Sequence, residues 1–206
     1  MNNSKLVSSF YKTKKRALTK EDMMKIITTE TIQATTLRTF TRDVFTFAYL
    51  CGGISFVDMA NLTLDNIYKE RIRYIRQKTH GEINLKLCDQ AKEIIEKYIS
   101  YREKATYLFP ILDARLHKTP MQKKNRVRKV LARINKELKV LASELEIKTD
   151  VTTYTARHSF ASILKNTGVN IALISQALGH QDIKTTEIYL SKFDDKQMDE
   201  IMSNLL

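Results

Sequence analysis

Apolar residues recur at helical spacing through most of the chain, and this pattern predicts a protein built mainly of helices. The first predicted helix begins after Thr19, which is followed by acidic residues in the manner of a capping box. A second runs from about Thr35 to Leu50 and stops at two consecutive glycines. Ser55, with an acid three residues later, caps a short third helix.

The pattern changes to an alternation of apolar and polar residues between positions 67 and 87. Three short segments, 67–68, 72–75 and 83–87, have this period of two, and the turn sequence Thr79-His80-Gly81 separates the last two. We therefore expect a small antiparallel sheet of two or three strands.

Helical spacing returns at Asp89, which we expect to cap the next helix. Thr119 and Pro120 supply a cap and an N1 proline for the longest predicted helix. The residues that this helix is expected to bury are Val127, Val130, Leu131, Ile134, Leu138 and Leu141.

Three closely spaced helices follow from Thr153 onward, separated by Gly168 and Gly179. Asn170 and Asp182 are their expected caps, and a last helix is predicted over residues 196–205. The predicted fold class is mainly α with a small antiparallel β-sheet, an α+β arrangement.

Composition narrows the class of protein. Among 206 residues there are only five glycines and two prolines, too few for a turn-rich all-β fold, and 43% hydrophobic residues suffice for a buried core. The longest apolar run, at residues 47–51, is far short of the roughly 20 needed to cross a bilayer. No signal peptide opens the chain, so we expect a cytoplasmic protein without a membrane partner.

The formal net charge of +12 favours nucleic acid over anionic lipid as a partner, because no amphipathic surface helix stands out. Cys51 and Cys88 lie outside any CxxC spacing, so we expect neither a metal site nor a disulfide, and we expect both thiols to be buried. No cofactor is predicted. Residues 1–18 are basic with little apolar periodicity and form the expected arm, and residues 19–206 form the expected domain.

The stretch from residue 151 to residue 189 carries the most specific pattern. It contains Tyr154-Thr155-Ala156-Arg157-His158-Ser159-Phe160-Ala161, then Leu178-Gly179-His180, then Thr185-Thr186-Glu187-Ile188-Tyr189. From Arg157 to His180 is 180 − 157 = 23 residues, and from His180 to Tyr189 is 189 − 180 = 9 residues. In order and spacing this set closely resembles the catalytic domain of the tyrosine recombinase, or phage integrase, family.

The resemblance extends over about residues 16–200. Residues 53–60, followed by Leu62, are similar to a helix-turn segment of integrases from phages and conjugative transposons, and residues 76–79 are similar to the β-hairpin lysine motif of the family. The N-terminal core-binding domain of that family has no counterpart in the sequence, so the resemblance implies a catalytic domain alone.

The resemblance implies a site-specific recombinase that cleaves and rejoins DNA through a 3′-phosphotyrosyl bond. Tyr189 would be the nucleophile, and Arg157 would stabilise charge on the transition-state phosphate. Lys78 would protonate the leaving 5′-oxygen. For His180 we favour donation of a hydrogen bond to the phosphate, with acceptance of the tyrosine proton as the alternative. Because bond energy is conserved, neither ATP nor a metal is required.

Two positions depart from the family pattern. Gly52 stands where relatives usually carry a first active-site arginine, and no arginine lies between Arg42 and Arg71. Our first candidate to replace it is Arg76, on the same strand face as Lys78, and the second is Arg42. Tyr154 stands where many relatives have histidine or lysine, and we expect it to orient the phosphate.

Further residues are candidates for DNA contacts. His158 is either a structural histidine or a phosphate contact. The cations of the longest helix form either a solvated face or a phosphate-binding face, and they include Lys123, Lys124, Arg126, Arg128 and Lys129. The expected partner is double-stranded DNA, bound by a homotetramer on two sites, with a monomer in its absence and a nucleoid-associated location in a bacterium.

Two other functions stay open. A type IB topoisomerase shares the chemistry, although residues 53–60 and the modest size argue against it. A catalytically impaired DNA-binding accessory protein is favoured by the glycine at position 52 and opposed by the joint presence of Lys78, Arg157, His180 and Tyr189.

Overall fold

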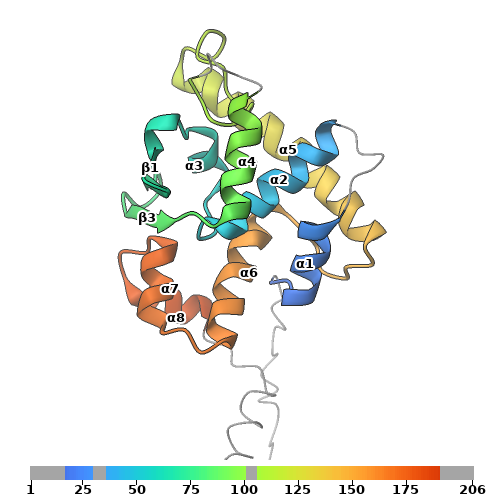
Figure 1. Cartoon of the computed structure of the whole chain (residues 1–206), viewed down its shortest axis with the longest axis vertical. Helices are drawn as coiled ribbons and strands as arrows, with labels where there is room; N and C mark the ends of the chain where they lie inside the picture. The colour runs from blue at the N-terminus through green and yellow to red at the C-terminus, as the bar shows by residue number, and fades with distance from the viewer. Residues whose placement is uncertain (1–16, 30–35, 101–105, 191–206) are drawn as a thin grey trace, which may run out of the picture.

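The computed structural model describes residues 17–29, 36–100 and 106–190 and consists of helices around one small sheet (Figure 1). In chain order the elements are α1 (Lys20–Thr28), α2 (Thr36–Leu50), α3 (Phe56–Ala60), the 3-10 turn η1 (Leu64–Asn66), β1 (Ile67–Tyr68), β2 (Arg71–Ile75), β3 (Glu82–Lys86), α4 (Asp89–Ser100), α5 (Pro120–Glu144), α6 (Thr153–Asn166), α7 (Ile171–Leu178) and α8 (Ile183–Leu190). The predicted α+β class is confirmed. The arm at residues 1–16 and the helix predicted over 196–205 lie outside the described residues.

The predicted helix starts are largely those that the structure has. Thr19 accepts a hydrogen bond from the backbone N–H of Asp22, Thr119 forms a capping box with Gln122, and Asn170 caps α7. The prediction for Asp89 is wrong. It is the first residue of α4, and its carboxylate reaches forward to Lys92 at 2.7 Å, where it also faces the positive end of the helix dipole.

Helix α2 is the centre of the main core. It packs against α1, α4, α5 and α6, and its buried side chains include Val44, Phe45 and Phe47. Phe47 meets Phe109 edge to face with ring centroids 4.9 Å apart. After Leu50 the chain turns through Gly52 and Gly53, both at positive φ, and so enters α3, whose Phe56, Met59 and Ala60 belong to the same core.

The sheet has the order β1-β2-β3, and both pairs are antiparallel. Ile72 and Tyr74 of β2 and Ile83 of β3 turn toward the core, while Arg73 and Ile75 face solvent, which is the alternation that the sequence predicts. The β2–β3 turn projects from this sheet beside α7, which contacts β3.

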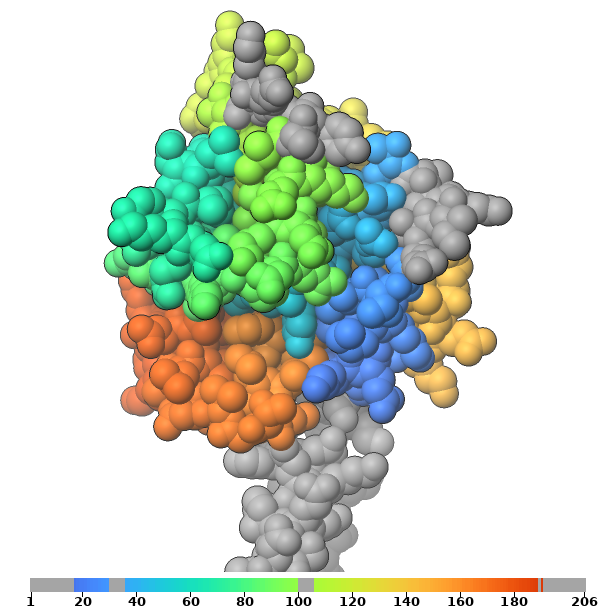
Figure 2. Space-filling model, in the orientation of Figure 1, coloured from blue at the N-terminus to red at the C-terminus, as the bar shows by residue number. Residues whose placement is uncertain are grey.

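A second, smaller apolar cluster joins the last three helices. Its buried members are Ala161, Ile174, Leu178 and Leu190, and it is separate from the main core. These helices form the orange region below the sheet in Figures 1 and 2. Leu18, which the sequence placed at the end of the arm, is buried in the main core, and its N–H donates to Ser159 Oγ at 2.9 Å.

Cys51 is buried, as expected, but Cys88 is exposed because it lies between β3 and α4, at the rim of the sheet. Burial raises the pKa of the Cys51 thiol, which keeps that side chain an inert part of the core. Among the described helices, none has the length and apolar character that a bilayer span requires.

Candidate active site

Arg157 lies in the first half of α6, where the main core meets the smaller cluster, and its side chain is 4% exposed. Its guanidinium connects three segments that are distant in sequence. Nη1 donates to the carbonyl of Gly53 at 3.0 Å, and Nη2 donates to the carbonyl of Leu178. A buried cation held by backbone acceptors keeps its charge and a fixed position, as stabilisation of a developing negative charge requires.

Gly53 permits this close approach. Its φ is +67°, and a Cβ there would lie 2.7 Å from Cα of Arg157, so the turn after α2 touches the α6 backbone directly. The turn and the arginine therefore determine each other's position, and a side chain at residue 53 would push Arg157 away.

The C-terminal turn of α7 is a second anchor. Gly179 ends the helix in the left-handed conformation, and its carbonyl and that of Leu178 both accept from Nη1 of Arg76, at 3.1 and 3.0 Å. Arg76 is 6% exposed, and the carbonyl of Gly179 also accepts from Thr79 Oγ1. Two buried arginines and a threonine therefore hold the segment that presents His180.

The β2–β3 turn carries Lys78 on its exposed side. Arg76 follows the last residue of β2, so the prediction that Arg76 and Lys78 share a strand face is wrong: Arg76 points into the protein and Lys78 points into solvent. The buried carboxylate of Asp58 secures the turn, because it accepts from the N–H of Gln77 at 2.9 Å and lies 4.0 Å from Nε of Arg76.

His180 completes the cluster. Its Nε2 lies 3.1 Å from Nη2 of Arg157, and its Nδ1 lies 2.8 Å from Oγ1 of Thr186 on α8. Desolvation, followed by the positive charges of Arg157 and Arg76, lowers the pKa of His180 to about 4. The imidazole is neutral at pH 7, so one of its ring nitrogens is a donor and the other is an acceptor.

The remaining candidates of this segment lie nearby on α6 and α8. Tyr154 is 51% exposed, and its ring meets that of His158 edge to face with centroids 4.6 Å apart. His158 is half-buried. Tyr189 belongs to α8, one turn after Thr186, and its side chain lies outside the part of the chain that the structure describes.

Comparison with known proteins decides the family. The model of the phage integrase family matches residues 16–196, nearly the whole chain. The chain belongs to this family.

Curated relatives support the same assignment. A tyrosine recombinase of Thermosipho africanus is 30% identical over 115 residues, which is 56% of this chain and 36% of the relative. The tyrosine recombinase XerC of Thermodesulfovibrio yellowstonii is 27% identical over 143 residues, or 68% of this chain and 46% of the relative. The chain spans less than half the length of these two relatives.

Solved structures share the fold. The Tn1549 transposon integrase in complex with transposon right end DNA has a TM-score of 0.65 at 16% identity, covering 92% of this chain and 65% of that chain. The XerA recombinase has a TM-score of 0.64 at 18% identity, covering 91% of this chain and 64% of that chain. The mainly helical domain with its three-stranded sheet is therefore the fold of an integrase catalytic domain.

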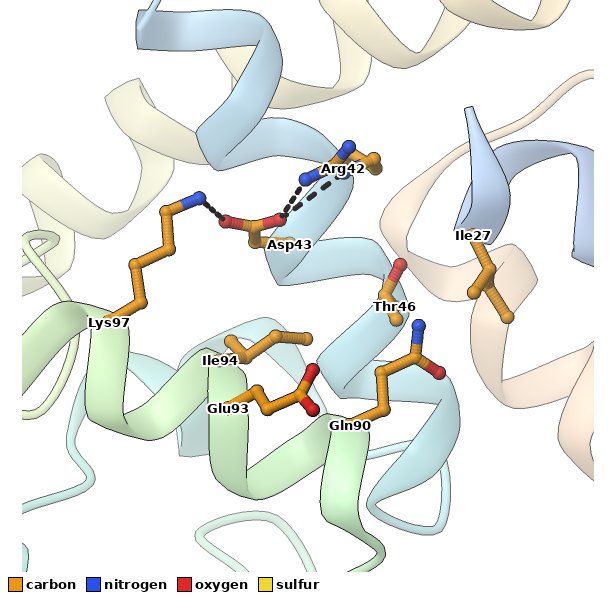
Figure 3. Close-up of a pocket in the computed structure, with 8 residues that line it drawn as sticks. All are labelled: Ile27, Arg42, Asp43, Thr46, Gln90, Glu93, Ile94 and Lys97. Carbon is orange, nitrogen blue, oxygen red and sulfur yellow. Dashed lines mark hydrogen bonds and ion pairs between the residues drawn. The ribbon is translucent and has the colours of Figure 1, made fainter. Parts of the chain in front are cut away.

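Arg42, the second candidate for the missing integrase arginine, lies elsewhere. Its Nη1 donates to the carbonyl of Thr29. The side chain faces a hollow between α1, α2 and α4, in which Nη2 lies 3.1 Å from Asp43 (Figure 3). Lys97 holds the other oxygen of the same carboxylate at 2.6 Å. The residues that line this hollow include neither Arg157 nor His180.

The predicted DNA-contact residues of α5 divide into two groups. Nε of Arg126 donates to the carbonyl of Ile111, and the ammonium of Lys123 lies over the ring of Tyr107, so both side chains have intramolecular partners. Lys139 is exposed but pairs with Asp150 at 3.3 Å. The other exposed cations extend further along the helix than predicted and are Lys124, Arg128, Lys129, Arg133 and Lys136. In the described part of the chain none of these five forms an ion pair; we call them the α5 basic face.

The sequence pattern did not reveal every residue that builds the site. Asp58 was recognised only as part of a helix cap, and Thr186 only as part of the motif. The carbonyls of Gly53, Leu178 and Gly179 have no side-chain signature, although both glycines adopt a positive φ, which glycine favours, and this is a reason to look there. Within the described ranges no group of three potential metal ligands is found.

Proposed function

We propose that this chain is the catalytic domain of a site-specific DNA recombinase that works through a 3′-phosphotyrosyl intermediate. The observation that carries the proposal is the convergence of Arg157, Arg76 and His180 on the α7 turn, beside the turn that bears Lys78 and the helix that bears Tyr189. A phosphate bound at this junction could be reached by the fixed guanidinium of Arg157, the exposed ammonium of Lys78 and the phenol of Tyr189, which come from three neighbouring elements.

The reaction is a transesterification. The Tyr189 oxygen attacks the phosphorus, a new P–O bond to tyrosine forms, and the bond from phosphorus to the 5′-oxygen breaks. The phenol proton goes to a base and the leaving oxygen receives a proton, so that a free 5′-hydroxyl is released. Attack of another 5′-hydroxyl on the phosphotyrosine reverses these steps and rejoins DNA.

The side chains have distinct roles in this scheme. Arg157 stabilises the non-bridging oxygens, because its guanidinium stays charged and is already oriented. Lys78 is exposed and supplies the proton to the leaving oxygen. For His180 we propose acceptance of the tyrosine proton in place of the donation that the sequence favoured. Nε2 faces a donor of Arg157 and is therefore the unprotonated nitrogen, which can take the proton once the tyrosine hydroxyl replaces that donor.

Arg76 takes the place of the arginine that relatives carry at the position of Gly52. It is buried at the α7 turn and shares the acceptor Leu178 with Arg157, so its charge lies beside the same site, whereas Arg42 is held by Asp43 and Thr29. We expect Arg76→Ala to slow cleavage at least about tenfold and Arg42→Ala to stay within about threefold of the parent. Slow cleavage by Arg42→Ala together with nearly unchanged cleavage by Arg76→Ala would instead make Arg42 the replacement.

Binding of double-stranded DNA rests on the α5 basic face and on Lys78. Lys129, Arg133 and Lys136 follow one another at four- and three-residue intervals, so they lie near one side of the helix and can track a row of phosphates. A homotetramer on two DNA sites, a monomer without DNA and a nucleoid-associated location in the cytoplasm complete the proposal.

A two-substrate assay tests this function against its alternatives. The chain is incubated with a supercoiled plasmid library carrying paired candidate sites, and the products are scored for recombinant junctions and for relaxed circles. Junctions that require Tyr189 support the recombinase. Relaxation without junctions would identify a topoisomerase, and binding without either product would identify the accessory protein that the glycine at position 52 favours.

A further inference from the structure

Thr186 makes a contact that the mechanism above does not use. It lies on α8, its side chain is fully buried, and Oγ1 lies 2.8 Å from Nδ1 of His180. The other ring nitrogen of the same histidine, Nε2, lies 3.1 Å from Nη2 of Arg157. His180 is thus held at both ring nitrogens by side chains from two different helices.

The chemistry of these partners determines where the ring proton lies. A guanidinium nitrogen can donate a hydrogen bond but cannot accept one, so Nε2 facing it must offer its lone pair. A neutral imidazole carries one proton, which leaves that proton on Nδ1. Nδ1 then donates to the Thr186 hydroxyl oxygen. A second proton, on Nε2, would oppose the charges of Arg157 and Arg76, which is consistent with the low pKa of about 4 for His180.

We propose that Thr186 is a positioning residue that fixes His180 in the Nδ1–H tautomer and so keeps the lone pair on Nε2, where replacement of the Arg157 hydrogen bond by the hydroxyl of the attacking tyrosine would let it accept the tyrosine proton. The sequence placement supports a coupling: Thr186 precedes Tyr189 by three residues, one turn of the same helix. The base acquires its correct tautomer only when α8, the helix that carries the nucleophile, is packed against α7.

The tautomer can be measured without DNA, which makes this test independent of the proposed function. Histidine is labelled with 15N in the whole chain, and long-range 1H–15N spectra at pH 7 show which ring nitrogen of each histidine is protonated. The signals of His180 are assigned with the His180→Gln variant. We expect a protonated Nδ1 and an unprotonated Nε2 in the parent, and a protonated Nε2 would overturn the proposal.

Substitutions of Thr186 then test whether its hydroxyl group fixes the tautomer of His180. Thr186→Val keeps the branched shape and removes the acceptor, so we expect it to lose the single tautomer, whereas Thr186→Ser keeps the oxygen and should retain it. Thr185→Val, at the exposed neighbouring position, is the matched control. An unchanged tautomer in Thr186→Val would overturn the proposal. Should that variant not fold, Thr186→Ala carries the same test, and the parent spectrum decides by itself.

The effect of Thr186 on catalysis rests on the proposed function and is measured separately, as a rate of DNA cleavage. In single-turnover cleavage of nicked DNA we expect Thr186→Val to be slower by at least about tenfold, with Thr186→Ser within about threefold. Equal rates for valine and threonine would contradict a role in positioning. If the parent itself forms no adduct, the proposed function fails while the spectra still decide the tautomer.

Discussion

The molecule holds the cations that we propose to be functional in two contrasting ways. At the junction of α3, α6 and α7, Arg76 and Arg157 are almost completely buried, and each donates to two backbone carbonyls. On the α5 basic face, five cations are exposed, and none forms an ion pair with a described residue. The first region has few charges in fixed positions, and the second has many charges that are free to move.

Under the proposed function, this contrast separates catalysis from affinity. A buried guanidinium is oriented before the substrate arrives, so no reorganisation opposes stabilisation of the transition state. Exposed cations gain affinity by neutralising phosphates and releasing counterions, and their contributions are graded and sensitive to salt. Changes in the first region should therefore act steeply on rate, and changes in the second should act gradually on binding.

The steepest effect is expected from Arg157→Lys. A lysine keeps the positive charge but cannot reach Gly53, Leu178 and a phosphate together, because its ammonium is one point charge. We expect single-turnover cleavage at saturating DNA to fall by about 10² to 10³. A rate within threefold of the parent would show that charge alone, without the anchored geometry, is sufficient.

Gly53→Ala tests whether backbone contact sets the position of that arginine. A Cβ at residue 53 would lie 2.7 Å from Cα of Arg157, at a backbone φ of +67°. Gly168→Ala is the matched control, because φ is +79° there but nothing lies within 4 Å of the added Cβ. Because of backbone strain, we expect chemical denaturation to show a free energy of unfolding lower by about 1–3 kcal/mol in both variants. Only Gly53→Ala should also cleave DNA more slowly, by about tenfold or more. Equal cleavage rates for the two variants would show that the close approach of residue 53 to Arg157 does not affect catalysis.

The α5 basic face should respond weakly and additively. We expect Lys124→Ala and Arg128→Ala each to weaken DNA binding and to reduce the slope of log affinity against log salt by about one. Cleavage at saturating DNA should be unchanged. Lys25→Ala removes an exposed cation on α1 that is paired with Asp22, and it serves as the control. Slopes identical to the parent would place the DNA on another face.

The smallest effect is on the pH dependence of stability. The pKa of His180 is about 4 in the folded protein and near 6.5 in the unfolded chain. The unfolded chain therefore binds more protons between these values, and the free energy of unfolding should decrease as pH falls from about 6.5 to about 4. Denaturant titrations should show a smaller decrease for His180→Gln. If the free energy of unfolding depended on pH in the same way for the parent and for His180→Gln, the pKa of His180 would be the same in the folded and unfolded states.

The sequence predicts the elements well where the local signal is strong. Caps at Thr19, Thr119 and Asn170 and the alternation of β2 and β3 are local properties, and the structure has them. The position of Asp89 is harder to predict. The helix dipole favours an acid at N1, and hydrogen bonding favours an acid at the N-cap, so the residue type alone does not distinguish the two positions.

The site is less accessible to such reasoning because its geometry depends on tertiary contacts. The motif identified Arg157 and His180, but whether Arg76 points inward depends on how the turn after β2 packs on α7. Arg126 and Arg128 are both cations of α5, but the loop carbonyl of Ile111, a tertiary contact, accepts from Arg126 and leaves Arg128 exposed. Contacts to backbone carbonyls leave no trace in residue types.

The most direct test of the central claim is a covalent-adduct assay with Tyr189. The chain and its Tyr189→Phe variant are incubated with pools of nicked DNA that lose the 5′-hydroxyl fragment on cleavage, and the products are resolved under denaturing conditions. We predict a slowly migrating protein–DNA adduct with the parent and none with the variant. An adduct of equal yield with Tyr189→Phe, or none with a parent that binds the pool, would contradict the account.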